Sequence, residues 1–404
     1  MDNRLEDFTQ RVDRELRDNI LKFWIRHMPD DEQGGFYGRI NNDLKVVKEA
    51  PKGLVLNTRI LWTYSAAWRL FGDDEYRRMA QRAYEYFVDR FWDKDHKGGY
   101  WMLNWQGRPL DPKKQVYGEA FTIYALSEYY RATADADSLN KAIELFELLE
   151  QKAVDPVYGG YFEGYTREWA YSKELLISDA EHPDSTKTMN THLHLMECYT
   201  NLLRVWDSSL LREKLIDLIN IVIDHIIDHE TWHFKLFFDD RWNSLTEDVS
   251  FGHDIEGSWL LTEAAEVAGD KALLARAEEI AIRMAEAVLN EGVDADGGLF
   301  YEGDGRSITN RGKYWWPQAE TVVGFLNAWQ LTGEGKYLDA ALKCWAFIEN
   351  SLVDRQNGDW FEYVKEGGRL PGPDEAKADP WKGPYHNGRA CMEVLTRLGQ
   401  AGRS

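Results

Sequence analysis

Two kinds of helical segment alternate along this chain, distinguished by where their apolar and polar residues fall. One kind is amphipathic, with Lys, Arg and Glu on one face, as expected of a helix that covers a core from outside. The other kind is more apolar and carries polar residues only in its first turn. The sequence predicts amphipathic helices at about 75–93, 136–153, 209–229, 270–290 and 335–352, and apolar helices that open at Asn57, Tyr117, Asn190, Gly252, Trp316 and Tyr385.

A short phrase of glycines and aromatic residues recurs once per unit. Paired glycines supply the positive φ values that tight hairpin turns need. Counted at residues 35, 99, 160, 298 and 358, the phrases lie 64, 61, 138 and 60 residues apart, and the long interval contains a degenerate aromatic stretch at 232–237. The chain is therefore predicted to hold six units of roughly sixty residues. The phrases are Gly34-Gly35-Phe36-Tyr37, Gly98-Gly99-Tyr100-Trp101, Gly159-Gly160-Tyr161-Phe162, Gly297-Gly298-Leu299-Phe300-Tyr301 and the weaker Gly358-Asp359-Trp360-Phe361.

Six units with two helices of unlike polarity predict an all-α fold, an (α/α)6 barrel of six helix-hairpin repeats. The apolar helices would form the inner ring, the charged ones the outer ring, and the glycine phrases short β-hairpins in the loops at one end. A tetratricopeptide solenoid is the alternative, but its period is about 34 residues and it has no such hairpin. No Pro/Gly/Ser-rich linker interrupts the repeats, so residues 1–404 are predicted to form a single catalytic domain.

Composition excludes several classes of partner. A net charge of −21 without any Lys/Arg stripe argues against nucleic acid. The N-terminus is acidic and amphipathic, so no signal peptide is predicted, and no stretch approaches the length of a membrane span. Cys198, Cys344 and Cys391 are scattered, as expected of reduced core residues. We expect a cytoplasmic protein, and the charged outer ring is compatible with a monomer.

The first turns of the apolar helices hold polar and aromatic residues that can do chemistry. In an α/α barrel all inner helices run the same way, so their N-terminal ends meet at one mouth. Six separate places in the sequence thus converge on one predicted pocket. The residues concerned are Asn57, Arg59 and Trp62; Tyr117 and Glu119; Asn190, His192 and His194; His253, Asp254 and Glu256; Trp315, Trp316 and Glu320; and Trp381, Tyr385 and His386.

Helical geometry restricts which of these side chains can face the pocket together. Residues i and i+2 point about 200° apart, whereas i and i+3 or i+4 share a face. His192 and His194 therefore cannot both face the pocket, and His194 is favoured because Asn190 can accompany it. The same spacing pairs His253 with Glu256, Trp316 with Glu320, and Arg59 with Trp62. Histidines with a glutamate are also a plausible zinc ligand set, but cysteine ligands are absent and we predict no metal site.

Histidine is the side chain best suited to take and return a proton at neutral pH. In a sugar, the hydrogen at C2 becomes acidic once the ring opens to an aldehyde, and its removal gives an enediolate. Arg59, Asn190 and His194 could stabilise the charge on the enediolate oxygens. Reprotonation of C2 from the other face gives the 2-epimer, and transfer of the proton to C1 gives the ketose. Neither outcome requires a cofactor.

Two other functions use the same residue types. A glycoside hydrolase needs two carboxyl groups at a defined separation, and Glu119, Asp254, Glu256 and Glu320 are candidates. A non-catalytic carbohydrate-binding protein would use the tryptophans, because Trp315 and Trp316 could stack on sugar faces. Such a protein would not need several titratable histidines.

Four blocks of the sequence stand at the starts of predicted inner helices, namely NTHLHLMECYTNLL, SFGHDIEGSWLL, KYWWPQAETVVGFLNAW and DPWKGPYHNGRACMEV. They resemble cellobiose 2-epimerases, within the wider N-acylglucosamine 2-epimerase superfamily, and the resemblance covers essentially the whole chain. It implies an (α/α)6 barrel that converts the reducing-end glucose of β-1,4-linked disaccharides to mannose, for example cellobiose to glucosyl-mannose and lactose to epilactose. An aldose–ketose isomerase or an N-acylglucosamine or mannose 2-epimerase is the main alternative within this resemblance.

The resemblance also implies roles for single residues. His253 of GHDIEG and His386 of PYHNGR look like the acid/base pair, with His386 the principal proton carrier at C2. His194 of NTHLH and Arg59 of NTRILW resemble the groups that hold the enediolate oxygens. Whether His253 is a second base, or one base acts twice, stays open. The positions that match sugar contacts are Tyr117, Asn190, Glu256, Trp315, Trp316, Glu320 and Trp381.

Overall fold

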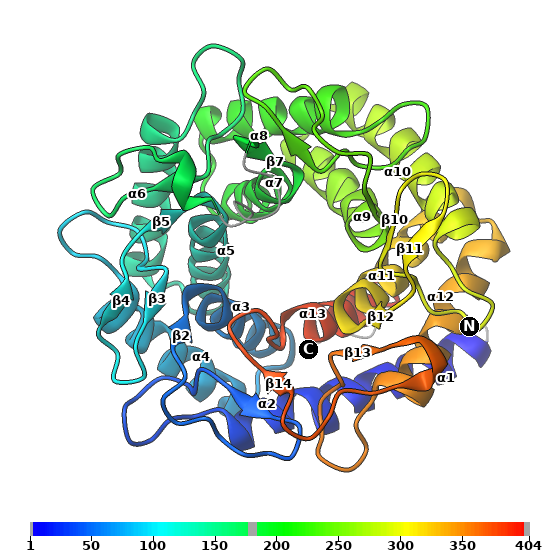
Figure 1. Ribbon diagram of the computed structural model, residues 1–404, viewed down its shortest axis with the longest axis horizontal. Coiled ribbons are helices and arrows are strands. Elements are labelled where there is room, and N and C mark those ends of the chain that lie inside the picture. Colours follow the sequence, from blue (N-terminus) through cyan, green and yellow to red (C-terminus); the bar gives the residue numbers. More distant parts are fainter. Residues whose placement is uncertain (1–2, 177–183, 400–404) are drawn as a thin grey trace.

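The computed structural model describes residues 3–176 and 184–399, and within these residues the helices form two concentric rings (Figure 1). Six inner helices surround the centre and six outer helical segments surround them, which is the predicted (α/α)6 barrel. Among the described residues, no helix is both long and apolar enough to span a membrane.

The inner ring consists of the apolar helices. Helix α5 (Val116–Thr133) is buried without a break from Val116 to Tyr129, because it packs between the inner helices on either side of it and against the outer helix that follows it. The predicted starts lie within three residues of the observed ones. The inner helices are α3 (Leu54–Phe71), α5 (Val116–Thr133), α7 (Met189–Leu203), α9 (Phe251–Ala268), α11 (Trp315–Thr332) and α13 (Tyr385–Arg397).

The outer ring consists of the amphipathic helices, which bury only the face that meets the inner ring. Side chains at their N-caps, such as Asp73 and Ser208, accept hydrogen bonds from backbone N–H groups of the first turn. Several outer helices end in a π-helical segment. The outer segments are α4 (Asp74–Tyr86) with η2 (Phe87–Phe91), α6 (Ala136–Lys152), α8 (Ser209–Ile221) with η4 (Val222–Ile226), α10 (Lys271–Glu291), α12 (Gly335–Phe347) with η5 (Ile348–Leu352), and the N-terminal α1 (Asn3–Arg14), η1 (Glu15–Ile20) and α2 (Leu21–His27).

The N-terminal segment supplies the outer helix that the sequence prediction lacked. α1 and η1 pack against α13, the last inner helix, so the two ends of the chain build one repeat together (Figure 1). The strands β1 (Ile40–Asn41) and β14 (Ala376–Ala378) pair antiparallel, with Ile40 opposite Ala378. This pairing closes the ring.

Every inner helix is preceded by a short strand that pairs antiparallel with a strand following the next outer helix. All six inner helices begin next to this layer of small sheets. They therefore all begin at the same end of the barrel. The pairs after β1–β14 are β2 (Lys52–Gly53) with β3 (Met102–Leu103), which also pairs β4 (Pro109–Asp111); β5 (Lys114–Gln115) with β6 (Gly164–Tyr165); β7 (Lys187–Thr188) with β8 (Phe237–Phe238); β9 (Val249–Ser250) with β10 (Glu302–Gly303), which also pairs β11 (Ile308–Asn310); and β12 (Lys313–Tyr314) with β13 (Tyr363–Val364). Two short 3₁₀ turns, η3 (Lys173–Leu175) and η6 (Glu366–Gly368), lie in the loops.

The glycine phrases are hairpin turns, as predicted. In the third, Oδ1 of Asp155 accepts from the N–H groups of Val157 and Tyr158, and Gly159 and Gly160 have φ values of +72° and +76°. In the second phrase, however, the left-handed pair is Lys97 and Gly98 rather than both glycines, and in the fourth phrase only the first glycine, Gly297, has a positive φ. The aromatic stretch of the fourth repeat forms the same turn, with Trp232 at φ +66°.

In the fourth repeat, the hairpin turn is stabilised by other residues than in the other repeats. In other repeats a buried lysine from the strand before the inner helix binds the first aspartate of the turn, as Lys187 binds Asp155 over 2.7 Å. In the fourth repeat Val249 stands at the lysine position of its strand. There the buried imidazole of His233 binds Asp254 through Nδ1 (2.8 Å) and Glu291 through Nε2 (3.1 Å).

Candidate active site

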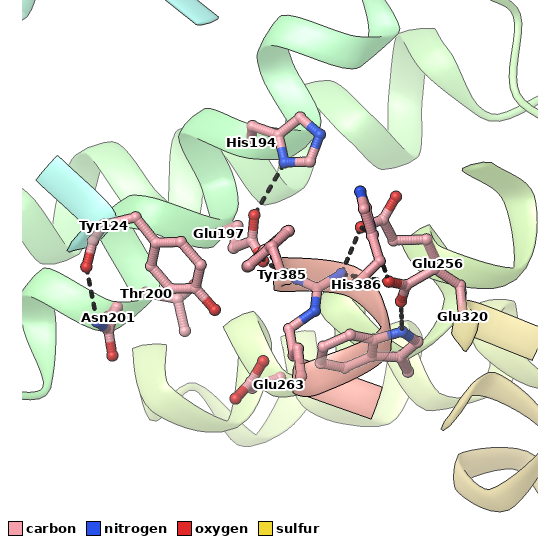
Figure 2. A network of polar contacts seen from close by, with 12 residues as sticks. Tyr124, His194, Glu197, Thr200, Asn201, Glu256, Glu263, Glu320, Tyr385 and His386 are labelled. Carbon is pink, nitrogen blue, oxygen red and sulfur yellow. Dashed lines mark hydrogen bonds and ion pairs between the residues drawn. The ribbon is translucent and has the colours of Figure 1, made fainter. Parts of the chain in front are cut away.

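The first turns of the inner helices meet at the end of the barrel that carries the small sheets, as expected. His386, in the first turn of α13, is 5% exposed. Its Nδ1 lies 2.7 Å from Oε1 of Glu320 on α11 and 3.9 Å from Oε1 of Glu256 on α9 (Figure 2). Burial, followed by the charges of Arg59 and Arg389, lowers the pKa of His386 well below its usual value. His386 is therefore neutral at pH 7.

His194, on α7, is held in a similar way by Glu197 one turn further along the same helix. Its Nδ1 lies 2.8 Å from Oε2 of Glu197, and its ring packs on the rings of Phe121 and Tyr117. Burial lowers the pKa of His194. Burial alone would raise the pKa of Glu197, but Arg389 and His194 bring it down to about 2. Glu197 is thus a carboxylate that accepts from His194.

His192 is placed elsewhere, in agreement with the expectation that it and His194 face different ways. Its Nε2 accepts the backbone N–H of Tyr161 over 2.9 Å, and its Nδ1 lies 2.7 Å from the carbonyl oxygen of Thr188. His192 therefore fastens the third hairpin turn to α7.

Arg59, on α3, lies beside the same group. Its guanidinium donates to the hydroxyl of Tyr117 over 3.0 Å and to the carbonyl oxygen of Trp381 over 2.6 Å, and it lies 4.6 Å from the ring centroid of Phe121. Its Nε is buried and makes no hydrogen bond within the described part of the chain. A fixed, buried cation of this kind suits a developing oxyanion.

His253, on α9, approaches His386 through an intervening tryptophan. The ring centroid of Trp316 lies 4.6 Å from that of His253 and 5.5 Å from that of His386. Nδ1 of His253 lies 2.7 Å from the hydroxyl of Ser250. Burial, and then the charge of His194, lowers the pKa of His253 to about 3. His253 is therefore neutral, like His386.

A cavity of about 620 Å³ is lined by His253 and Tyr117 of this group, but not by His386, His194 or Arg59. Of the predicted site residues, Tyr117, Asn190, His253 and Trp381 line it. The Oδ1 atom of Asn190 is buried and has no partner among the described residues, so it is available to a ligand. The remaining lining residues are Glu163, Thr188, Met189, Thr191, Leu236, Phe237, Asp248, Ser250, Tyr301, Glu302 and Thr309.

Three predicted pocket residues lie outside this group. Trp315 packs near Lys382, whose ammonium lies 5.7 Å from its ring centroid, and it does not line the cavity. Trp62 lines a second cavity, of about 500 Å³, with residues such as Arg204 and Arg397 from the last turns of inner helices. The step of three positions from Arg59 to Trp62 thus carries the chain toward the opposite end of the barrel. Asn57 binds the carbonyl oxygen of Gly53 within its own helix start.

The four carboxyl groups considered for a glycoside hydrolase are engaged by the protein. Both oxygens of Glu119 accept the backbone N–H of Gly99, and Asp254 accepts from the N–H of Phe234 and from His233. Glu256 and Glu320 form ion pairs with Arg389.

Arg389, Glu197 and Tyr385 are the main members of the site that sequence reasoning assigned no role. The guanidinium of Arg389 contacts Glu197, Glu256 and Glu320, and the hydroxyl of Tyr385 donates to Glu197. The available signal was the i+3 spacing of Glu197 from His194 and of Arg389 from His386.

One described group of side chains has the spacing of metal ligands, namely Glu256, Glu320 and His386. NH2 of Arg389 already lies 2.5 Å from Glu256 and 2.7 Å from Glu320, so a guanidinium supplies the positive charge there.

The sequence also contains one His-Glu-x-x-His stretch, His229 to His233, which the prediction of no metal site overlooked. It lies in the fourth hairpin turn rather than on a helix, and His233 is bound to two carboxylates. This is not the helical arrangement that places two histidines on one metal.

The comparisons with known proteins place this (α/α)6 barrel among the enzymes that isomerise or epimerise carbohydrates. Residues 35–389 match the model of the N-acylglucosamine 2-epimerase (GlcNAc 2-epimerase) family. The chain therefore belongs to the N-acylglucosamine 2-epimerase family, whose members epimerise sugars, and the resemblance seen in the sequence is confirmed at this level.

Individual proteins and solved structures are similar to this chain over almost its full length. The chain is 46% identical over 391 residues to cellobiose 2-epimerase of Bacteroides fragilis, an alignment that covers 96% of this chain and 99% of that protein. The structure of cellobiose 2-epimerase from Bacillus thermoamylovorans B4167 matches with a TM-score of 0.92 at 36% identity, covering 97% of this chain and 100% of that one. A D-mannose isomerase structure matches with a TM-score of 0.81 at 20% identity over 96% of this chain and 97% of that one, a likeness of fold alone.

Proposed function

We propose that this protein inverts C2 of the reducing-end glucose of β-1,4-linked disaccharides, converting cellobiose to glucosyl-mannose and lactose to epilactose. Two relatives that are 46% and 38% identical over almost the whole of this chain are cellobiose 2-epimerases. The observation that carries the proposal is that His386 and His253 both pack on Trp316, with Arg59 and His194 nearby. The adjoining cavity has the size typical of a small-molecule site.

Proton transfer at C2 is assigned to His386. Because Glu320 accepts from Nδ1, the lone pair of His386 is on Nε2, and its lowered pKa keeps the ring neutral and able to take a proton. The enediolate then places negative charge on the oxygens at C1 and C2. Arg59 stabilises that charge. His194, whose Nδ1 is bonded to Glu197, accepts at its free Nε2 a hydrogen bond from the enediolate oxygen that keeps its proton. His253 exchanges protons with the oxygen released by ring opening.

Sugar contacts are assigned to the aromatic and polar residues around these groups. Trp381 is 42% exposed at the cavity, close to the rings of Trp101 and Tyr117, and offers a flat face to the second sugar. Asn190 offers an unpaired amide oxygen to a sugar hydroxyl. Glu256, Glu320 and Trp316 lie at the histidine end, where the reacting sugar would sit. Trp315, buried beside Lys382, would act by supporting Trp316.

The test is incubation with cellobiose in D2O, followed by proton NMR. Glucosyl-mannose carrying deuterium at C2 is expected. A ketose as the main product would instead indicate an aldose–ketose isomerase, and free glucose would indicate a hydrolase. A matched incubation with the His386→Asn protein should show no exchange at C2.

We infer in addition that the protein is a cytoplasmic monomer that binds neither nucleic acid nor membranes. The net charge of −21 opposes binding to polyanions. Cys198, Cys344 and Cys391 are buried free thiols, as suits a reducing compartment. Size-exclusion chromatography with light scattering should give the mass of one chain, and the mass of a dimer would contradict the monomer.

A further inference from the structure

Arg389 lies at the centre of the buried polar groups beneath the pocket. It is on α13, one turn after His386, and only 1% of it is exposed. Its NH1 group donates to Oε1 of Glu197 and to the hydroxyl of Tyr385. Its NH2 group donates to Oε1 of Glu256 over 2.5 Å and to Oε1 of Glu320 over 2.7 Å. One guanidinium thus binds carboxylates from three other inner helices, α7, α9 and α11.

Two of these carboxylates each hold one of the site histidines. Glu197 binds Nδ1 of His194 over 2.8 Å, and Glu320 binds Nδ1 of His386 over 2.7 Å. Each histidine is therefore the third and last member of an Arg389–carboxylate–histidine chain. The planar fork of an arginine can bind two carboxylates at once in fixed directions, which a lysine cannot do.

Each carboxylate oxygen of Glu197 and of Glu320 accepts at least one hydrogen bond. The Oε2 atom of Glu320 accepts from the indole N–H of Trp259 over 3.1 Å, and Oε1 of Glu197 accepts from Tyr385 as well as from Arg389. Each carboxylate can therefore take only one orientation. The tautomer and the direction of each imidazole follow from it, because a histidine is oriented by the partner at its other nitrogen.

The protonation states of the buried carboxylates and histidines in this region depend on the positive charge of Arg389. Three carboxylates surround it, and burying like charges without a cation favours their protonation. Without Arg389, protons would be taken up by the carboxylates or by the histidines. The charged and titratable groups that face His386 are Glu256, Glu320, Glu197, His194, Arg59, Arg389 and Tyr385. Those that face His194 are Glu197, Arg59, Arg389, His253, His386 and Tyr117.

We propose that Arg389 is a positioning residue that links the Glu197–His194 and Glu320–His386 pairs into one rigid unit. It keeps both imidazoles neutral with Nδ1 protonated and Nε2 free, so that both present a lone pair to the sugar. This rests on the proposed function for what the two histidines do, but the arrangement itself can be measured on the protein without sugar.

The first experiment compares Arg389→Gln, which loses the charge and the fork, with Arg389→Lys, which keeps the charge alone. We expect Arg389→Gln to lower kcat on cellobiose roughly 10²-fold or more, the cost that a shift of about 1 Å in a catalytic group can carry. KM should change little, and the acidic limb of the kcat/KM profile should move to higher pH. Arg389→Lys should restore the acidic limb while kcat stays at least tenfold low.

Arg397→Lys is the matched control, because Arg397 lies on the same helix at the opposite end of the barrel and binds Asn327 and Glu393. It should leave kcat and the pH profile unchanged. Equal losses of kcat in Arg389→Gln and Arg389→Lys with an unmoved acidic limb would show a merely structural arginine and overturn the proposal. So would wild-type kcat in a folded Arg389→Gln protein.

The second experiment does not depend on a stable variant or on the identity of the sugar. Long-range ¹H–¹⁵N NMR of the unmodified, sugar-free protein should show His194 and His386 neutral at pH 7 with hydrogen on Nδ1. Hydrogen on Nε2 of either ring, or a charged ring, would overturn the proposal. If the tautomers are as expected but cellobiose is not epimerised, the proposed function fails and the positioning role stands.

Discussion

The imidazole of His386 and the carboxylate of Glu320 are joined by a 2.7 Å hydrogen bond between Nδ1 and Oε1, although they come from different inner helices, α13 and α11. The bond fixes which nitrogen of His386 is free. His386 is 5% exposed, and its Nε2 is the nitrogen left for a substrate.

Replacing His386 by Asn should therefore remove most of the activity. Loss of a general acid/base typically costs about 10²- to 10⁴-fold, and none of the neighbouring groups can replace an imidazole held by Glu320. The measurement is kcat with cellobiose, alongside His229→Asn as a control at an exposed histidine in the fourth hairpin turn. Turnover above a tenth of the wild-type value would contradict the role given to His386.

Replacement by Gln should change the free energy of unfolding differently at Glu320 and at Glu256. Both oxygens of Glu320 accept hydrogen bonds, so the amide NH2 of Gln would face a donor, and we expect a loss of about 1–3 kcal/mol in the free energy of unfolding. The Oε2 atom of Glu256 is buried with no partner among the described residues, and burial with the nearby charge of Glu320 raises the pKa of Glu256 well above its usual value. Glu256→Gln should thus cost little or stabilise the fold. Urea denaturation of the two variants decides, and a larger loss for Glu256→Gln would refute this reading.

The fold was predictable because its repeat is visible in the sequence. Polar first turns on apolar helices and the glycine phrases located the inner helices to within three residues. The outer helix formed by α1, η1 and α2 was missed, because a count of repeats along the chain does not show that the last repeat is completed from the N-terminus. The left-handed Lys97 was missed because only the shape of the turn, not the residue type, marks it.

The site was predictable only where a residue lies in a first turn. His194, His253 and His386 met at one end because all inner helices start there, although their roles stay predictions. Arg389 and Glu197 escaped attention because each lies one turn deeper, on a helix that reads as apolar core. Their function depends on contacts between α7, α9, α11 and α13, and a single sequence does not give the rotation of four helices about their axes.

Gly160 should tolerate alanine far less well than its neighbour Gly159. Both have positive φ, so each pays about 1–2 kcal/mol for the left-handed backbone of a residue with Cβ. A Cβ on Gly160 would also lie 2.4 Å from the ring of Trp242 and 2.8 Å from Nε2 of His192, whereas one on Gly159 meets nothing within 4 Å. We expect Gly160→Ala to cost about 1–3 kcal/mol more than Gly159→Ala in urea denaturation. Equal costs would mean that the turn shifts freely against Trp242.

His233 should make the stability of the fold depend on alkaline pH. Burial alone would lower the pKa of His233, but its bonds to Asp254 and Glu291 raise it to about 9. A pKa that is higher in the folded than in the unfolded chain stabilises the fold fully below about pH 6.5, and this stabilisation is lost as the pH rises through about 9.

The size of this effect is at most about 3 kcal/mol, since the two pKa values differ by about two and a half units. The measurement is the urea midpoint of the wild-type and His233→Gln proteins at intervals from pH 6 to pH 10. The stability advantage of the wild type should be greatest near pH 6 and should shrink toward pH 10. Because groups away from this site titrate equally in both proteins, the difference between them reports His233 together with its partners Asp254 and Glu291. A difference that does not change with pH would show that His233 is neutral in the folded protein.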